Sequence, residues 1–388
     1  MMSLQLRSAT EIRWYCPKFE KSRLHVLVSF LPTIPNIRLL SLFGEEITEA
    51  QQAIIFGLPT LRTLVLDYCR FHPSTKPLPL SNVTALRLAD NDIQTTRRLL
   101  TIVAPTLETL TFDFFEATFG QDLQGELTKL HKLTTLKLVA YTHGVKPTML
   151  ETFKKCTSIT TICILPFHDH ALLSLHHSDL PTLCSVTCDH QLAMTLIPKR
   201  PVKTYVQVLS RSLEEPSMLP DALSQTTAGI TSLKLHLLNS FYSLLPSLAP
   251  SLQHLEQLTL MSVMRPLVWY AARSPDQLSG QDLHNPPGAP AVILPKLKRV
   301  EIWVNYSKLI DIEFPPERLL KECFIPACPA LEVFECLGAH DLYKYHFGLL
   351  PKPKEAWKVR RLPDGSWERQ GPPPIPTHIH ANKLYAAP

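Results

Sequence analysis

The sequence has little glycine, little charge and no long apolar run. Glycine accounts for 12 of 388 residues, and charged residues for 19%. Disordered chains combine low hydrophobicity with high charge, whereas 45% of this chain is hydrophobic, so the disordered class is excluded. A membrane helix needs about 18 consecutive apolar residues. The stretch 235–255 is broken by Asn239, Pro246 and Pro250, so we expect no membrane span.

Signals of secretion are also missing. The first residues, Met1 to Cys16, contain no apolar segment of the kind that a signal peptide needs. The nine cysteines are scattered and form no C-x-x-C pair. Scattered cysteines without a disulfide spacing are typical of reduced, mostly buried thiols. We therefore expect a cytoplasmic or nuclear protein.

Motifs of catalysis are absent as well. The sequence contains no Walker-type phosphate loop, no G-x-G-x-x-G, no G-x-S-x-G and no H-E-x-x-H. Two groups of ligand-type side chains occur: His168, Asp169, His170, His176 and His177 in the first, and Cys184, Cys188 and His190 in the second. Metal ligands need fixed geometry, and an i, i+2 pair in a turn favours a solvated surface instead. We expect no enzyme, metal or cofactor, and a metal-dependent enzyme is the less favoured alternative.

The net charge of +5 is unevenly distributed. Residues 349–388 hold seven Lys and Arg against three acids, a net charge of +4, which leaves about +1 for the preceding residues. A nucleic-acid-binding surface requires a basic stripe across the folded body. The nearly neutral body argues against nucleic acid as a partner.

The sequence is rich in one apolar pattern, L-x-x-L-x-L, with any apolar residue at the L positions. Copies begin at Ile37, Leu61, Val83, Leu107, Leu133, Ile159, Leu183, Ile230, Leu255, Leu297 and Leu331. The first seven starts are 22–26 residues apart, and the gap of 47 residues before Ile230 equals two periods. We therefore predict a degenerate copy in that gap, at residues 201–208.

Proline marks the beginning of many copies. It lies two positions before the first apolar residue at Pro35, Pro59, Pro105, Pro181, Pro295 and Pro329. Because proline cannot continue a helix and favours extended neighbours, each of these prolines predicts the end of a helix and the start of a strand. Thr48 and Gln51 form a capping-box pattern for one helix. Further helices are predicted over 95–103, 147–153 and 221–223.

This pattern resembles the leucine-rich-repeat superfamily over residues 37–348. The resemblance implies an α/β fold, a leucine-rich-repeat solenoid (horseshoe) with parallel strands on the concave face and helices on the convex face. Strands about 4.8 Å apart and helices about 8–10 Å apart make such a stack curve. The superfamily often places Asn or Cys eight positions after the first leucine, and Cys69, Asn91 and Asn305 match this position.

The segments outside the repeats have different compositions. Residues 1–36 are predicted to form an N-terminal cap, with a strand over 11–16 and a helix over 24–31. An inserted loop rich in Pro, Gly and Ser is expected near 270–292. Residues 349–388 form a basic, Pro-rich tail, in which the turn at Pro363-Asp364-Gly365 predicts a β-hairpin with Trp357 and Trp367 as cross-strand anchors.

The irregular repeats, the final copy Cys328-Pro329-Ala330-Leu331 and the Asp-Gly-Ser-Trp tail resemble fungal F-box/leucine-rich-repeat proteins. The resemblance implies a substrate-recognition subunit, whose F-box docks on the adaptor of a cullin–RING ubiquitin ligase. The usual F-box start is not matched at residues 31–34, so the box either lies upstream or has been lost. The alternative is a free-standing leucine-rich-repeat adaptor.

In both readings a protein partner is expected on the concave face, where the residues between the ladder positions point outward. The candidates are Asp67, Arg87, Asp113, Lys137, Lys234, His236, Arg299, Glu301 and Trp303. Arg and Trp are enriched in binding hot spots. Three aromatic residues at strand exits, Phe114, Phe115 and Tyr141, either bind the partner or pack in the core.

Overall fold

The computed structural model describes residues 9–15, 24–73, 81–114, 123–140, 156–165, 175–208, 219–237, 248–262, 293–305, 320–339 and 356–370. The chain divides into two compact units, Met1–Leu196 and Ile197–Pro388. Each unit contains a sheet whose strands follow one another in the order of the sequence. None of the helices in the described ranges is long and apolar enough to cross a membrane.

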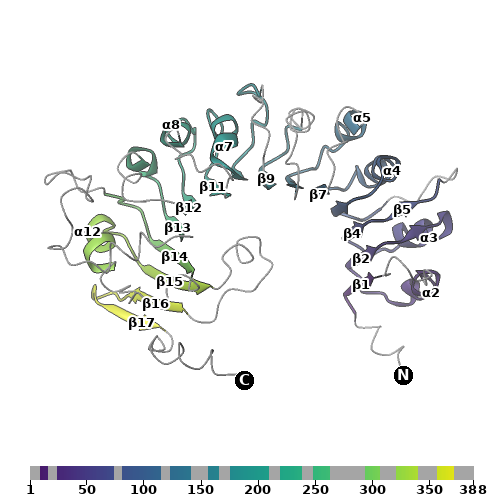
Figure 1. Ribbon diagram of the computed structural model, residues 1–388, viewed down its shortest axis with the longest axis horizontal. Coiled ribbons are helices and arrows are strands. Elements are labelled where there is room, and N and C mark those ends of the chain that lie inside the picture. Colours follow the sequence, from purple (N-terminus) through teal and green to yellow (C-terminus); the bar gives the residue numbers. More distant parts are fainter. Residues whose placement is uncertain are drawn as a thin grey trace, which may run out of the picture. The chain divides into compact units, whose positions relative to one another are not determined.

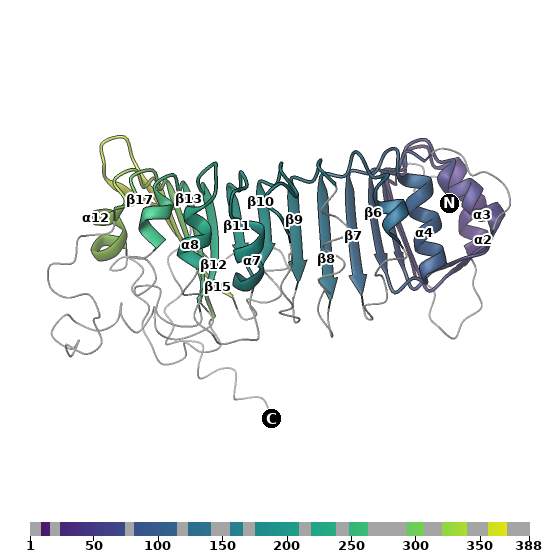
Figure 2. The ribbon, with the colours of Figure 1, turned by 90° about the horizontal axis from the view of Figure 1, so that it is seen from above.

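The first unit has an all-parallel main sheet (Figures 1 and 2). Its strands are β1 (Glu11–Tyr15), β2 (Leu39–Phe43), β4 (Thr63–Asp67), β6 (Ala85–Ala89), β7 (Thr109–Phe114), β8 (Thr135–Ala140), β9 (Thr161–Leu165) and β10 (Ser185–Cys188). Its helices are α2 (Leu24–Phe30), α3 (Glu49–Phe56), α4 (Ile93–Val103), α5 (Gln124–Leu127) and α7 (His190–Leu196), with a 3₁₀ turn at Leu31–Thr33. A second, two-stranded sheet pairs β3 (Glu46–Ile47) with β5 (Arg70–Phe71).

The second unit begins with parallel strands and ends with antiparallel ones. Its strands are β11 (Thr204–Gln207), β12 (Ser232–Leu237), β13 (Gln257–Ser262), β14 (Arg299–Asn305), β15 (Val333–Ala339), β16 (Ala356–Arg361) and β17 (Trp367–Gln370). Its helical segments are α8 (Leu219–Ser224), Ala249–Leu252, Leu320–Phe324 and α12 (Ile325–Ala327). Strand β11 lies in the predicted degenerate copy, whose third ladder position is the buried Gln207.

The apolar ladder explains the stacking of the strands. In β2 and β4 the side chains of Leu40, Leu42, Leu64 and Leu66 are fully buried, and the register pairs Leu40 with Leu64 and Leu42 with Leu66. The residues between them are half-buried. Strand burial therefore alternates with period two, one side facing the helices and the other facing away. This arrangement confirms the predicted leucine-rich-repeat fold.

Helices cover one face of the sheet in each unit (Figure 1). We call the opposite side the helix-free face, since no helix of the described residues lies on it. Two predicted helix limits are found in the structure: α2 begins at Leu24, and α4 ends at Val103. Thr48 caps α3 through the predicted capping box. The backbone N–H of Gln51 donates to the Thr48 hydroxyl, and the side-chain oxygen of Gln51 accepts from the backbone N–H of Thr48 at 2.8 Å. The predicted helix over 147–153 lies outside the described residues.

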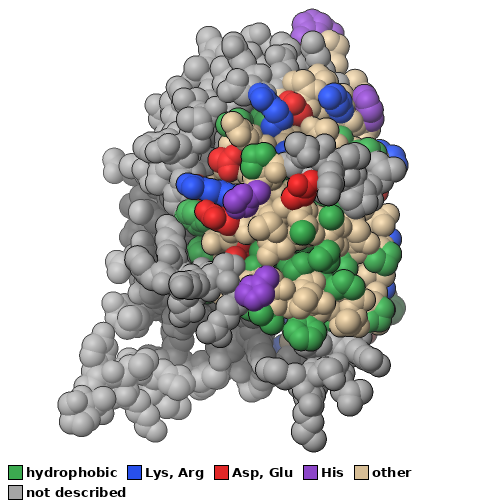
Figure 3. Space-filling model, turned by 90° about the vertical axis from the view of Figure 1, so that its right-hand side faces the viewer, with side chains coloured by type: hydrophobic (Ala, Val, Ile, Leu, Met, Phe, Trp, Pro, Cys, Tyr) green, Lys and Arg blue, Asp and Glu red, His purple; other side chains and the backbone are tan. Residues whose placement is uncertain are grey.

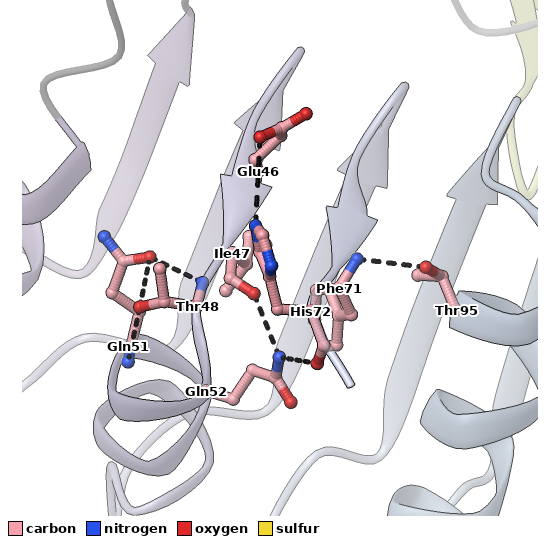
Figure 4. Close-up of polar contacts among 8 residues, drawn as sticks. All are labelled: Glu46, Ile47, Thr48, Gln51, Gln52, Phe71, His72 and Thr95. Atoms are coloured by element: carbon pink, nitrogen blue, oxygen red, sulfur yellow. Dashed lines mark hydrogen bonds and ion pairs between the residues drawn. The ribbon is translucent and has the colours of Figure 1, made fainter. Parts of the chain in front are cut away.

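Buried amides connect α3 to the two-stranded sheet (Figure 4). The Gln52 side chain is fully buried, and its Nε2 donates to the carbonyl oxygens of Ile47 and His72, each at 2.9 Å. The Phe71 N–H donates to the Thr95 hydroxyl of α4 at 3.0 Å. The Ile47 carbonyl also accepts from the His72 N–H at 3.0 Å, so the Gln52 amide adds a second bond there. At the His72 carbonyl and the Phe71 N–H, side chains of α3 and α4 supply partners for backbone groups at the end of the short strand β5.

Hydroxyl groups after the prolines connect neighbouring repeats. Thr60, Thr106 and Thr182 each follow a proline at the start of a copy. The Thr60 hydroxyl lies 2.8 Å from the Ile37 carbonyl oxygen, and the Thr106 hydroxyl lies 2.7 Å from that of Val83. The Thr182 hydroxyl makes the same bond one repeat back. The Pro-Thr-Leu sequence therefore both ends a helix and ties one repeat to the preceding repeat.

One of the residues at the Asn-or-Cys position bonds the backbone of the preceding copy. Asn91, which is buried, accepts from the Cys69 N–H at 2.8 Å and donates to the Leu66 carbonyl at 2.7 Å. The sulfur of Cys69 in turn lies 3.4 Å from the Leu42 carbonyl oxygen. The side chain of Asn305 lies outside the described residues.

The hairpin β16–β17 forms at the predicted turn and continues the sheet beyond the last repeat. Strand β16 pairs antiparallel with β15, a pairing that the sequence did not indicate. The register places Trp367 opposite Arg361, and Trp357 opposite Cys336 of β15. The prediction of Trp357 and Trp367 as a cross-strand pair of the hairpin is therefore wrong, because the register pairs Trp367 with Arg361. The inserted loop near 270–292 lies outside the described residues, and the predicted domain limits stay predictions.

Candidate functional surface

The strand register of the first unit arranges the side chains of the helix-free face in rows that cross the strands. One row contains Tyr15, Phe43, Asp67, Ala89, Asp113 and Val139. The next contains Arg13, Ser41, Val65, Arg87, Thr111 and Lys137. Four of the predicted binding residues, Asp67, Arg87, Asp113 and Lys137, therefore lie on one face and in two adjacent rows.

Arg87 and Asp113 form an ion pair on this face. Nη2 and Nε of Arg87 lie 2.5 and 2.8 Å from Oδ2 of Asp113. Asp113 is buried, whereas Arg87 is exposed. Burial raises the pKa of Asp113, and the Arg87 guanidinium partly offsets this rise. Arg87 is therefore already bonded to Asp113, whereas Lys137 in the same row is exposed.

Asp67 has a less favourable environment than Asp113. Burial raises its pKa, Arg87 lowers it, and the negative charges of Asp113 and Asp90 raise it further. Its Oδ1 is buried and accepts no hydrogen bond, and the same holds for Oδ2 of Asp90 in the turn after β6, within the part of the chain that the structure describes. The carboxylate of Asp67 is therefore desolvated without full compensation.

In the second unit, Glu335 joins three elements. Its Oε2 accepts from Nη2 of Arg299 at 2.6 Å, and its Oε1 lies 2.8 Å from Nζ of Lys358. Burial alone would raise the pKa of Glu335, but the hydrogen bonds from Lys358 and Arg299 outweigh it, and the pKa lies below its ordinary value. The network links strands β14, β15 and β16. Arg299, predicted as a binding residue, thus also has a structural role.

Glu301 and Trp303 lie on the helix-free face but are buried, with exposed fractions of 8% and 5%. Nε1 of Trp303 donates to Oε1 of Glu301, and Nζ of Lys234 lies 5.7 Å from the centroid of the Trp303 ring. The register places Trp303 between Met261 and Leu337, which are also buried. The two residues are less accessible than an outward strand position implies.

Some predicted positions lie outside the described set. The backbone of His236 pairs with Met261, but its side chain is not described. The same is true of the Phe114 side chain and of residues Phe115 and Tyr141.

Several notable residues were missed at the sequence level. Phe43 and Glu335 occupy outward positions of recognised copies, so the repeat pattern could have indicated them. Tyr68 follows β4 and Asp90 follows β6, and the φ angles of these two residues are positive, at 58° and 51°. Apolar periodicity gives no signal for this turn conformation. Lys358 lies on a strand with no repeat, and only the fold brings it to Glu335.

The histidine and cysteine groups do not form a metal site among the described residues, where no cluster of three or more ligand-type side chains is found. His168, Asp169 and His170 lie outside that set. His176 and His177 are exposed, and Nδ1 of His176 lies 2.8 Å from the Ser178 hydroxyl.

Most of the described cysteines are buried. Burial raises the pKa of Cys69 to about 12, of Cys156 to about 11 and of Cys328 to about 12. Burial also raises the pKa of Cys188, in the ladder of β10, well above its ordinary value. Such thiols stay protonated at neutral pH and are poor ligands and nucleophiles.

No protein-family model and no curated protein matches the sequence. Among solved structures, the chain is similar to an internalin (inlF) from Listeria monocytogenes, with 14% sequence identity and a TM-score of 0.35. The superposition covers 77% of this chain and 82% of the internalin chain. At this level of similarity, nothing about binding is transferred from the internalin.

Proposed function

We propose that this protein is a non-catalytic scaffold that binds a protein partner on its helix-free face. Leucine-rich-repeat folds typically serve as protein-interaction scaffolds, because stacked repeats offer an extended surface rather than a pocket. The observation that carries the proposal is the pair of cross-strand rows in the first unit, which combine aromatic, acidic and basic side chains. Mixed surfaces of this kind suit polar protein interfaces.

The proposal is tested with a matched pair of charge reversals. Lys137 is exposed on the helix-free face, and Lys129 is exposed just after α5, on the helical side. We expect Lys137→Glu to reduce recovery of proteins that co-purify with the tagged full-length chain from the cells that express it. Lys129→Glu should leave their recovery unchanged. Equal recovery with both variants would count against binding on this face.

We further propose that the scaffold is a substrate-recognition subunit of an F-box type ubiquitin ligase. The resemblance of the irregular repeats and of the final copy to F-box/leucine-rich-repeat proteins supports this role. The expected result is an adaptor–cullin pair among the co-purified proteins, retained in Lys137→Glu because the adaptor does not use the partner-binding face. Recovery of the partner without that pair would favour the alternative, a free-standing leucine-rich-repeat adaptor.

We also propose that the protein acts in the cytoplasm or nucleus. The seven described cysteines carry free thiols, as is typical of reducing compartments. Fluorescence microscopy of the tagged chain tests this placement, and a signal confined to the secretory pathway would contradict it.

A further inference from the structure

The first strand of the first unit has an open edge. Among the described residues, β1 pairs only with β2 and lies at the end of its sheet (Figure 1). The Thr10 carbonyl oxygen accepts from the Leu39 N–H of the neighbouring chain segment at 3.1 Å. Successive residues of a strand direct their backbone groups to opposite sides, so those of Glu11, Arg13 and Tyr15 point away from β2. The open edge therefore presents a row of N–H and C=O groups.

The sequence of β1 does not block this edge. Natural edge strands are often protected by lysine, by proline or by a bulge. Strand β1 contains neither lysine nor proline, and its register with β2 is continuous. Its two charged residues, Glu11 and Arg13, have opposite signs and form an ion pair on the helix-free face, with side chains 44% and 77% exposed. The edge is therefore available to a further strand.

The apolar ladder is incompletely covered at the same end of the unit. Ile12 and Trp14 occupy the ladder positions of β1 and are only half-buried, whereas the leucines opposite them in β2 are fully buried. Three of the five exposed large hydrophobic residues of the described set, Tyr15, Val26 and Phe30, belong to β1 and α2. Figure 3 views the first unit from this end, where hydrophobic side chains gather. Such a concentration of exposed apolar side chains is typical of an interface.

The charges of β1 are complementary to those of a second copy of the same strand. In an antiparallel pair with a two-fold axis at Ile12, Glu11 lies opposite the partner's Arg13, and Arg13 lies opposite the partner's Glu11. Both residues direct their backbone groups to the open edge, so both positions are hydrogen-bonded pairs, and the four charges alternate in sign around a square. The neighbouring registers, centred on Glu11 or on Arg13, place like charges opposite each other, which is destabilising.

We propose that the protein forms a two-fold symmetric dimer through its β1 edges, with Glu11 of each copy opposite Arg13 of the partner subunit. On the helical side of the sheet the two Ile12 side chains lie opposite each other, and each covers the open end of the other's apolar ladder. Because the axis is two-fold, the contact closes at a pair and does not continue into a filament. The two helix-free faces lie on the same side of the joined sheet, so the dimer presents the proposed partner-binding face twice.

The first experiment measures the mass of the full-length chain in solution by sedimentation velocity, at concentrations of about 1–200 µM. We expect a monomer–dimer equilibrium with a Kd on the order of 10–100 µM, since a single strand pair makes a small interface. A chain that stays monomeric over this range would overturn the proposal. Species larger than a dimer would also overturn it, because they require a contact that is not two-fold.

The second experiment uses charge reversals that can complement each other. Glu11→Arg and Arg13→Glu each place like charges opposite one another, so each variant alone should dimerise at least about tenfold more weakly than the wild type. In an equimolar mixture every arginine again faces a glutamate, and the two variants should form a heterodimer with wild-type affinity. The control is Lys129→Glu, which changes the net charge as Arg13→Glu does, at an exposed residue after α5. It should dimerise as the wild type does.

These variants test the pairing directly. Thermal unfolding of each variant shows whether it is folded. Wild-type dimerisation of the single variants, or failure of the folded pair to form a heterodimer, would contradict the pairing of Glu11 with Arg13. The scaffold proposal is tested separately, since Lys137→Glu should leave the dimer intact.

Hydrogen exchange resolved by residue locates the interface. The amides of Glu11 and Arg13 should exchange more slowly as the protein concentration rises, because the partner strand protects them. The amides of Ile12 and Trp14 face β2, so their exchange should not depend on concentration. A dimer in which the Glu11 and Arg13 amides stay unprotected would place the contact on another surface and overturn the proposal.

Discussion

Replacing Glu335 with glutamine should loosen the C-terminal hairpin. Glu335 is 7% exposed and receives hydrogen bonds from Arg299 of β14 and Lys358 of β16. The substitution keeps the shape of the side chain but removes its charge. Lys358 then loses its carboxylate partner, and Arg299 keeps only its longer contact with Glu301, at 3.5 Å. The new amide also leaves a donor that neither cation can satisfy.

The size of the effect follows from the exposure of the partners. The side chains of Arg299 and Lys358 are 40% and 34% exposed, so solvent screens both pairs and each is worth less than a buried ion pair. We estimate a total loss of about 1–2 kcal/mol, which corresponds to a roughly five- to thirtyfold change in an opening equilibrium. Because β16 and β17 lie at the end of the sheet, the loss should appear there first.

Hydrogen exchange is the appropriate assay. The amides of β16 and β17 should exchange roughly five to thirty times faster in Glu335→Gln, whereas those of β12 and β13 should keep wild-type rates. The control is Glu332→Gln, because Glu332 is exposed and lies three residues earlier.

The pH dependence gives a second readout for Glu335. Its pKa is lower in the folded chain than its ordinary value of 4.5, so its stabilising effect is complete above that value and is lost as the pH falls through the folded pKa. The difference between wild type and variant should therefore shrink in acid. Unchanged exchange in β16 and β17 at neutral pH would refute the idea that this carboxylate holds the hairpin to the last repeat.

Three further changes test other parts of the structure. Asp67→Asn should raise the midpoint temperature of thermal unfolding, because only ionised Asp67 carries the desolvation cost. This gain in stability should grow as the pH rises from the ordinary pKa of 3.8 through the raised folded pKa, and a difference that does not depend on pH would contradict this. Asn91→Ala should cost about 2–5 kcal/mol in denaturant unfolding, since the Cys69 N–H and the Leu66 carbonyl lose their partners; a loss below about 1 kcal/mol would mean that water replaces the amide. Gly229→Ala should destabilise by at least about 1 kcal/mol, because φ is +73° and an added Cβ would lie 2.7 Å from the His254 ring; a neutral result by the same assay would show that the ring moves aside.

The repeated strands could be predicted because their signal is local and recurs. In Leu61, Leu64 and Leu66 the apolar spacing already determines which side chains face the helices, and the prolines indicate where each copy begins. Even the weak copy at β11 was indicated, by the length of the gap around it. The hydroxyl bonds of Thr60 and Thr106 were missed, although the Pro-Thr-Leu triplets recur.

The surface was harder to predict because it depends on pairings between distant segments. The Arg87–Asp113 pair follows from strand register, which the spacing of the copies allowed in principle. By contrast, Lys358 reaches Glu335 only because the hairpin pairs antiparallel with β15. The burial of Trp303 could not be predicted either, since an alternating strand pattern specifies the face of a side chain but not what covers it.

The buried thiols provide a set of natural probes distributed along the repeats. Cys69, Cys156, Cys188 and Cys328 lie in different copies, and each stays protonated and shielded while its own copy is closed. Repeats of a solenoid contact mainly their neighbours, so each can open separately. An alkylating reagent followed by peptide mapping would therefore time the opening of each copy in the unmodified chain, and the order of labelling would reveal whether the stack unravels from its ends or from its middle.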